Sequence, residues 1–386
     1  MAKRLRIGLN FFFDNKSNSG IVNYIYNIVS ALNTLKITTK PKLLIFYSLN
    51  APINFIKEIN YPYIKFILFK PYSSNIFIRK TNSFIRRITK QDLFINWNYF
   101  NKIDSLFPFF DFSDKTFRYF KKKIHWLVDF NNRAFPNHYK DCGEQMNDYQ
   151  KKIVFSRDRV VISSNFLLEE LKNYYPDYTC DIQVLQFASS INVKEDPKIF
   201  EKYKLKEELY FISPNQFWEH KNQKLVLEAL SLVKKLNPAL KFKVIFTGSL
   251  DVNRGNGQYI EQLKTLVVNL NIQNYVEFLG VIEREDQIFL MKHAIAIIQP
   301  SMYEGWSTLV EEAKALNKFI ILSDLPVHRE QITKNVSFFE PLNAVILANK
   351  MINQLIEPQE IILDDYKKNI EKFGKDIIRI LSFSKN

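Results

Sequence analysis

Short apolar runs alternate with longer segments of helical periodicity along most of the chain. Residues 6–13 form a continuous apolar run, which is typical of a strand buried in a parallel sheet. After a polar turn at residues 14–20, apolar residues recur at helical spacing from Ile21 to Leu32. Further strands are predicted at residues 42–47, 64–69, 124–128 and 160–163, and a helix at 165–174.

The second half of the chain repeats this alternation. Strands are predicted at residues 209–213, 242–246, 276–279, 294–298 and 319–322, with helices at 223–236, 260–270 and 284–293. Repeated strand–helix–strand units predict parallel sheets with helices on both faces, so the fold class is α/β with two doubly wound domains. Ligands of such sheets bind beyond the carboxyl ends of the strands, which predicts a cleft between two facing domains.

A polar segment at residues 190–206 is the best candidate for a linker between the two domains. It predicts an N-terminal domain at 1–190 and a C-terminal domain at 205–365, and a last helix at 366–386 could cross back to the first domain. A length of 386 residues also favours two domains, and 46% hydrophobic residues exclude a disordered chain.

The start of the chain, its apolar runs and its cysteines indicate where in the cell the protein is expected. The basic and then apolar start has too short an apolar part for a signal peptide, so it indicates a first strand. No apolar run reaches the ~18 residues of a membrane span. Cys142 and Cys180 are the only cysteines in the sequence and form no disulfide framework, which is expected in a reducing cytoplasm.

Positive charge is concentrated in the first half. Residues 1–190 hold 28 Lys and Arg against 15 Asp and Glu, a net charge of +13. The whole chain has 54 Lys and Arg and 40 Asp and Glu, so residues 191–386 hold 26 basic and 25 acidic residues, a net charge of +1. Eleven of the basic residues lie between Arg79 and Lys123, and Phe77 and Phe84 interleave with the first of them. A basic, aromatic-rich amphipathic segment suits an anionic membrane surface. A solvated basic face and a nucleic-acid-binding surface remain as alternatives.

The stretch from Pro300 to Asn317 predicts a tight turn followed by a helix. Glu304 lies in the turn and Glu312 two turns into the helix, about 12 Å apart along the axis at roughly 1.5 Å per residue. Between them the free N–H groups of residues 306–309 open the helix and favour an anion. Two carboxylates around an anion site match a nucleoside diphosphate sugar. The alternative is an ordinary strand–turn–helix with two solvated glutamates.

Residues 304–312 resemble the E-x7-E motif of retaining GT-B glycosyltransferases of family 4. The loop at 213–222 is similar to the first strand–loop–helix of that family's donor domain, and residues 317–330 resemble its next strand and loop. Glycines end two of the intervening strands in the same order. The resemblance covers residues 208–345 well and the N-terminal domain loosely. It implies the GT-B fold, in which two Rossmann-like domains face an interdomain cleft.

The resemblance also implies roles for individual residues. Glu312 would accept hydrogen bonds from the ribose of the donor nucleotide, and Glu304 would hold hydroxyls of the donor sugar. Lys221 would neutralise the departing diphosphate, unless it is a solvated lysine at a helix start. Gly20 would let the backbone approach the diphosphate, or is a plain turn glycine. The other donor-binding positions implied are Asn215, Gly248, Gly305, Trp306, Ser307, Thr308 and Leu309.

The N-terminal domain departs from the family pattern at residues 125–136. Many members carry a histidine–aspartate pair there, with the histidine near the donor sugar. Val128 precedes Asp129 in this chain, so that histidine is absent. Asp129, Asn132 or Arg133 could serve in place of that histidine. His125 is expected to point into the sheet, and His220 could cap or pack. The catalytic candidates are then Glu304, Lys221 and Asp129.

The activity that the resemblance implies is hexosyl transfer with retention. The donor would be a nucleoside diphosphate sugar and the acceptor a glycan or a polyprenyl or other lipid-linked saccharide, in assembly of a bacterial-type surface polysaccharide or lipopolysaccharide. The sequence has no Asp-x-Asp triplet and no zinc-binding spacing, so neither a metal nor another cofactor is expected. The expected location is cytoplasmic, peripheral on the inner face of the membrane, without a nucleic-acid partner. A catalytically inactive nucleotide-sugar-binding protein and a basic nucleic-acid-binding protein are the alternatives.

Overall fold

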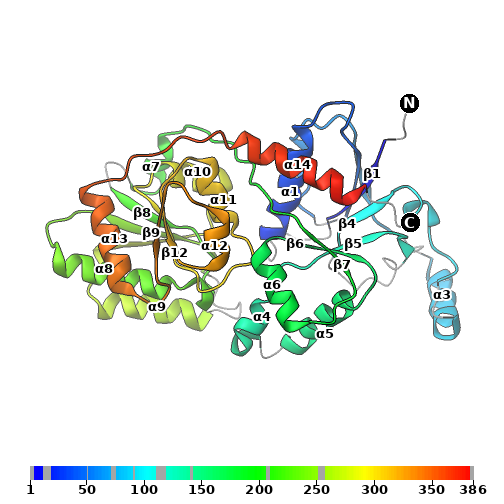
Figure 1. Ribbon diagram of the computed structural model, residues 1–386, viewed down its shortest axis with the longest axis horizontal. Helices are drawn as coiled ribbons and strands as arrows, with labels where there is room; N and C mark the ends of the chain where they lie inside the picture. Colours follow the sequence, from blue (N-terminus) through cyan, green and yellow to red (C-terminus); the bar gives the residue numbers. More distant parts are fainter. Residues whose placement is uncertain are drawn as a thin grey trace.

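Two parallel sheets, each covered by helices, form the two domains of the chain (Figure 1). The computed structural model describes residues 4–11, 19–49, 51–70, 75–89, 92–109, 119–139, 142–205, 209–250 and 257–382. The first sheet has the strand order β3-β2-β1-β4-β5-β6-β7 and the second the order β10-β9-β8-β11-β12-β13. All pairs of neighbouring strands in both sheets are parallel. The predicted α/β class with two doubly wound domains is therefore confirmed.

The N-terminal sheet is built from residues 6–184. Its strands are β1 (Arg6–Phe11), β2 (Lys42–Tyr47), β3 (Ile64–Leu68), β4 (Ser105–Phe109), β5 (Lys123–Trp126), β6 (Arg159–Ile162) and β7 (Asp181–Val184). Its helices are α1 (Ser19–Asn33), α2 (Asn54–Lys57), α3 (Ile76–Thr89), α4 (Asn131–Ala134), α5 (Gly143–Val154) and α6 (Asn165–Tyr174), with short 3-10 turns η1 (Trp97–Tyr99) and η3 (Pro136–Tyr139). The central strands β1 and β4 are buried on both faces, as continuous apolar runs require.

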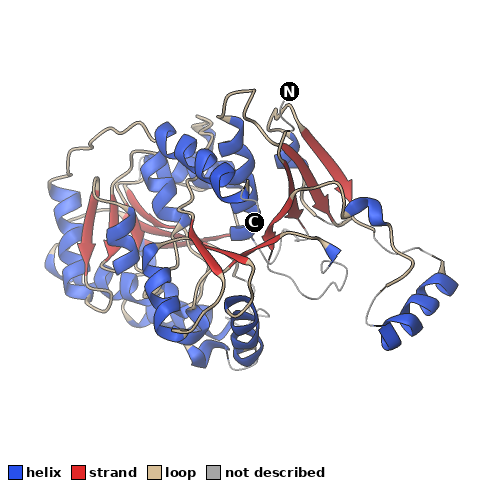
Figure 2. Cartoon of the chain, turned by 45° about the vertical axis from the view of Figure 1, so that its right-hand side comes forward, coloured by secondary structure: helices blue, strands red, loops and turns tan. Residues whose placement is uncertain are grey.

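The C-terminal sheet is built from residues 210–339, with helices on both of its sides (Figure 2). Its strands are β8 (Tyr210–Ser213), β9 (Lys243–Thr247), β10 (Val276–Gly280), β11 (Ile297–Gln299), β12 (Ile320–Ser323) and β13 (Val336–Phe339). Its helices are α8 (Gln223–Leu236), α9 (Gly257–Asn269), α10 (Arg284–His293), α11 (Thr308–Ala315), α12 (Pro326–Gln331) and α13 (Ala344–Ile356), with 3-10 turns η4 (Glu219–Lys221) and η5 (Gln273–Tyr275).

The linker is shorter than the predicted segment 190–206. Helix α7 (Lys198–Lys202) lies inside that segment, and Ile199 and Leu205 are buried in the core of the C-terminal domain. Lys202 and Tyr203 also contact Asp286 of α10, at 2.5 Å and 2.7 Å. Residues 198–205 therefore pack as part of the C-terminal domain. The predicted linker was too long because α7 is short and mostly polar, and it buries apolar residues on only one of its sides.

The last helix, α14 (Lys367–Leu381), crosses back to the N-terminal domain and packs on α1 (Figure 1). Gly374 permits this contact, because a Cβ there would lie 2.5 Å from the carbonyl oxygen of Ala31. Arg159 Nη1 donates to the carbonyl of Ile380 at 2.6 Å and so satisfies one of the orphan carbonyls at the helix end. The crossover that the sequence allowed is confirmed. None of the helices within the described ranges is both long and apolar enough to cross a membrane.

Candidate active site

The turn between β11 and α11 holds Glu304 in a dense set of hydrogen bonds. Its Oε1 atom accepts from Lys221 Nζ at 2.5 Å, from Ser301 Oγ at 2.7 Å and from Gln299 Nε2 at 2.8 Å. Burial opposes ionisation of Glu304, but the attraction and hydrogen bond of Lys221 outweigh it and hold the pKa of the carboxyl below its ordinary value. Glu304 is thus a buried, ionised carboxylate with a fixed orientation.

Lys221 reaches Glu304 because of the backbone between β8 and α8. The 3-10 turn η4 is followed by its C-cap residue Asn222, which has a left-handed φ of 56°. Asparagine tolerates this conformation better than most residues do. The Nδ2 atom of Asn222 donates to the carbonyl of Pro341 at 2.8 Å and anchors the turn. The turn therefore directs the lysine toward the carboxyl end of β11.

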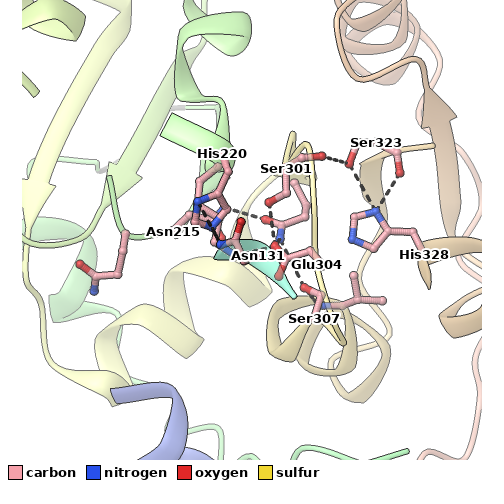
Figure 3. Close-up of polar contacts among 12 residues, drawn as sticks. Asn131, Asn215, His220, Ser301, Glu304, Ser307, Ser323 and His328 are labelled. Carbon is pink, nitrogen blue, oxygen red and sulfur yellow. Dashed lines mark hydrogen bonds and ion pairs between the residues drawn. The ribbon is translucent and has the colours of Figure 1, made fainter. Parts of the chain in front are cut away.

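Asn131 of the N-terminal domain meets His220 of the C-terminal domain, as Figure 3 shows. Its Nδ2 atom lies 3.4 Å and 3.5 Å from the two ring nitrogens of His220 and donates to Tyr139 Oη at 3.0 Å. Burial, reinforced by the neighbouring Lys221, lowers the pKa of His220 to about 3. The imidazole is therefore neutral near pH 7, and it packs across the domain boundary as the sequence allowed.

Asp129 completes the group of predicted catalytic residues. Its Oδ1 atom accepts from the backbone N–H of Asn131 at 3.0 Å. Burial raises the pKa of Asp129, repulsion from Glu304 adds to the rise, and the hydrogen bond and Lys221 oppose it. These interactions mean that the structure brings Asp129, Glu304 and Lys221 together, although they come from three separate loops of two domains.

Gly305 is the point at which the turn touches the N-terminal domain. A Cβ at this position would lie 2.6 Å from the carbonyl oxygen of Val128 and 3.0 Å from Cβ of Asp129. The carbonyl of Gly305 accepts a hydrogen bond from Ser164 Oγ at 2.9 Å. Close packing between the domains therefore accounts for the glycine, and its contact with a donor stays a prediction.

Glu312 is closer to the start of its helix than the sequence predicted. Helix α11 begins at Thr308, so residues 304–307 are not helical and the estimate of about 12 Å along one axis is wrong. Glu312 lies in the second turn, almost fully buried. Its carboxylate is paired with Arg284 at the start of α10, through Nη1 at 3.3 Å and a closer contact to Nη2. A ligand that uses Glu312 would share it with Arg284.

The start of α11 offers fewer free N–H groups than expected. Ser307 is the N-cap, and its Oγ accepts from the N–H of Val310 at 3.4 Å. The N–H of Ser307 itself donates to Gln331 Oε1 at 3.1 Å, so the prediction of a free N–H at Ser307 is wrong. Leu309 is buried in the apolar core, which leaves it only its backbone to offer a ligand. Thr308 is half-buried, and its role stays a prediction.

Trp306 directs its side chain into the N-terminal domain. The indole Nε1–H donates to the carbonyl of Phe187 at 3.0 Å, and the ring packs edge to face on the ring of Phe187 with 6.4 Å between centroids. The neighbouring Tyr303 accepts from the N–H of Phe130 at 3.0 Å and donates to Glu170 at 2.5 Å. Tyr303 and Trp306 therefore both hold the two domains together.

Asn215 and Gly248 lie together at the carboxyl ends of β8 and β9. Asn215 Nδ2 donates to Gln299 Oε1 at 2.6 Å. Gly248 has a φ of +146°, and a Cβ there would lie 2.6 Å from the carbonyl oxygen of Asn215.

By contrast, Gly20 is exposed at the start of α1 and a Cβ would meet nothing within 4 Å. No packing within the described part of the chain requires a glycine at position 20.

The alternatives to Asp129 are used within the N-terminal domain. Asn132 bonds Asn147 at 2.9 Å and Gln150 at 2.8 Å. Arg133 donates to Gln150 at 3.1 Å and also contacts Tyr175. His125 is buried on β5, where its ring lies 5.2 Å from that of Phe109, so the prediction that it points into the sheet is confirmed.

Sequence reasoning missed several residues that build the site. His328 of α12 is fully buried, its Nδ1 lies 2.8 Å from the carbonyl oxygen of Ser323, and Figure 3 shows it beside Glu304. Gln299 and Ser301 could have been found, because polar side chains at the end of an apolar strand mark the binding edge of a parallel sheet. His328 gave no such signal, since its position depends on how α12 folds back.

Residues 195–376 match the model of the family glycosyl transferases group 1. The O-antigen chain mannosyltransferase RfbU of Salmonella typhimurium is 29% identical over 140 residues, which span 36% of this chain and 36% of the relative. A glycosyltransferase from Rickettsia africae has a TM-score of 0.59 at 19% identity, over 98% of this chain and 94% of that one.

Anabaena HepE, solved in complex with UDP and glucose, has a TM-score of 0.65 at 13% identity and covers 98% of both chains. At such low identity the solved structures bear on the fold alone. Together with the two parallel-sheet domains they establish the architecture. The chain has the GT-B fold of glycosyltransferases, and its residues 195–376 match the model of the family glycosyl transferases group 1.

Proposed function

We propose that the protein is a family 4 glycosyltransferase of the retaining type, which moves a hexose from a nucleoside diphosphate sugar to a glycan or lipid-linked acceptor. The observation that carries the proposal is the Lys221–Glu304 ion pair beside Asp129 at the domain boundary. An ionised, oriented carboxylate next to a cation suits a substrate that has both hydroxyls and phosphates. The family match over the C-terminal domain supports the same reading.

Glu304 is assigned to the sugar. The three hydrogen bonds described for its carboxylate all go to Oε1. Within the described residues Oε2 receives no hydrogen bond, and we assign this oxygen to a hydroxyl of the donor sugar. Glu312, held by Arg284, is assigned to the ribose hydroxyls.

Lys221 is assigned to the diphosphate. Its ammonium group has three N–H donors, and Glu304 takes one of them. In the proposed reaction the bond between the anomeric carbon and the phosphate oxygen breaks, and its electron pair stays on the phosphate. A fixed cation stabilises the charge that develops there. The acceptor oxygen bonds to the anomeric carbon on the same face, and its proton passes to the departing phosphate oxygen.

Asp129 is assigned to the acceptor side, where a hydrogen bond from the acceptor hydroxyl would orient it. Lys221 supplies the positive charge, so the proposal includes no metal ion, and chelation with EDTA is expected to leave turnover unchanged. The proposed setting is assembly of a surface polysaccharide or lipopolysaccharide in the cytoplasm, at the inner face of the membrane. The match to an O-antigen chain mannosyltransferase supports this setting.

Transfer assays with UDP-glucose, UDP-galactose and GDP-mannose test the proposal. Glu304→Ala should chiefly lower kcat, and Glu312→Ala should chiefly raise the KM for the donor. Glu261→Gln is the control, because Glu261 pairs with Lys264 on the exposed face of α9. Transfer at the wild-type rate in both site variants would overturn the assignments. Donor binding without transfer to any acceptor would instead favour a binding protein.

A further inference from the structure

Helix α3 carries a row of exposed apolar side chains. Phe77, Phe84 and Ile88 are 76%, 63% and 69% exposed. Residues seven and four positions apart lie on one face of a helix, so the three side chains form a single row. Figures 1 and 2 both show α3 standing out from the rest of the N-terminal domain. Exposed apolar rows of this kind mark interaction sites on soluble domains.

Basic side chains flank this row. Lys80 and Arg87 are both exposed and lie seven residues apart, on one side of the apolar row. Arg79 is also exposed, but it lies on the opposite side of the helix from the apolar row. A helix with an apolar face bordered by lysine and arginine lies in the interface of an anionic bilayer, where the apolar side chains enter the acyl region and the cations stay at the headgroups.

Polar contacts fix α3 from the opposite side. Asn82 is 1% exposed. Its Oδ1 accepts from the N–H of Leu93 at 3.1 Å and of Phe94 at 2.8 Å, and its Nδ2 donates to the carbonyl of Phe94 at 2.6 Å. Arg86 pairs with the buried Asp92 at 2.7 Å. These bonds attach the helix through its polar side and leave the apolar row unused.

The same contacts present a second apolar element. The loop that Asn82 holds carries Leu93, Phe94 and Trp97, all of them exposed. Because Asn82 accepts from two backbone N–H groups of this loop and donates to one of its carbonyls, it fixes the loop relative to α3. The row on α3 and the loop at 92–97 are named the α3 surface below.

We propose that the α3 surface docks the protein onto an anionic phospholipid bilayer. This inference deepens the proposed function, because it names the surface that would bring the enzyme to a lipid-linked acceptor. Charge complementarity favours this occupant, since the half of the chain that carries α3 has a balance of +13. A second copy of the chain would instead bring Lys80 and Arg87 toward their own counterparts.

Flotation of the full chain with vesicles tests the inference without any turnover. The wild type should float with vesicles of equal phosphatidylcholine and phosphatidylglycerol, but not with phosphatidylcholine alone. The Phe77→Ser/Phe84→Ser variant should lose at least about tenfold in partitioning. Lys80→Gln/Arg87→Gln should lose about 25-fold, because each basic group near such a surface contributes about fivefold.

Matched controls separate the α3 surface from general stickiness. Leu342→Ser/Leu363→Ser removes two equally exposed apolar residues of the C-terminal half, and Lys235→Gln/Lys241→Gln removes two exposed lysines there. Both controls should float as the wild type does. Equal loss in controls and α3 variants, or no flotation of the wild type, would overturn the inference. So would concentration-dependent dimerisation or nucleic-acid binding that the α3 variants abolish while vesicle binding is absent.

The two proposals fail separately. Transfer of sugar to a soluble acceptor with no binding to vesicles would remove the docking inference and keep the enzyme. Specific flotation with no donor binding would keep the docking surface and remove the proposed function.

Discussion

Lys221 Nζ lies 2.5 Å from Glu304 Oε1, and the two side chains are only 19% and 10% exposed. This pair links the loop after β8 to the turn after β11, which are neighbouring strands of one sheet. A buried ion pair adds little net stability, but removal of one partner leaves an uncompensated charge. The pair therefore makes the position of Glu304 sensitive to every change at residue 221.

Replacement of Lys221 by methionine should destabilise the protein by about 3 kcal/mol near neutral pH, because Glu304 then stays buried without its cation. The wild-type pKa of Glu304 is lowered, so the pair stabilises the fold above the ordinary glutamate pKa and this contribution fades as the pH falls through the lowered value. Urea unfolding at several pH values measures the difference. A gap between wild type and Lys221→Met that stays constant into acid would contradict the account.

Gly305→Ala should disturb the contact between the domains. The new Cβ would lie 2.6 Å from the carbonyl oxygen of Val128, which is backbone and cannot rotate away. We expect a loss of about 1–3 kcal/mol in the free energy of unfolding and a reduced transfer rate, with the circular dichroism of both domains retained. Gly143→Ala is the control, since its nearest neighbour would be 3.6 Å away. Equal behaviour of the two variants would refute the packing argument.

His220 should not titrate between pH 5 and 8. Burial lowers its pKa to about 3, whereas an unfolded chain has the ordinary value of 6.5. The folded state therefore binds fewer protons than the unfolded state between these values, and stability falls with acid by up to about 1.4 kcal/mol per pH unit. His220→Asn should lack this part of the acid sensitivity. An NMR titration of the imidazole that shows a midpoint near 6.5 would disprove the prediction.

Glu330→Gln should weaken a second contact between the domains. The carboxylate of Glu330 accepts from the N–H of Asn165 at 2.9 Å and of Phe166 at 3.1 Å, and from Gln186 Nε2 at 2.6 Å. A negative charge at the start of α6 also interacts favourably with the helix dipole. We expect faster amide exchange at residues 165–167 and a loss of about 1–2 kcal/mol. Exchange as slow as in the wild type would count against this cap.

The strands and helices with regular apolar patterns were predictable from the sequence. The bounds of β2, α6, α8 and α10 agree with the prediction. Strand β4 was missed since Ser105 and Pro108 break its apolar run, although both are buried. Strands β7 and β13, each at the edge of a sheet, were also missed.

The sequence identified three residues that lie close together in the structure, but it did not identify their neighbours or the pairings of the site. Glu304, Lys221 and Asp129 were identified and do lie together. The pairing of Arg284 with Glu312 joins two residues that lie 28 positions apart in the chain, on different helices. Local patterns carry no information about such contacts, since the packing of the whole sheet sets them.

The most direct test of the central claim is calorimetric titration of the full chain with UDP-glucose, UDP-galactose and GDP-mannose. The account predicts that wild type and Glu261→Gln bind one of these donors with equal affinity, and that Glu312→Ala binds it at least about tenfold more weakly. Undiminished binding by Glu312→Ala, or binding of none of the three donors by the wild type, would contradict the account.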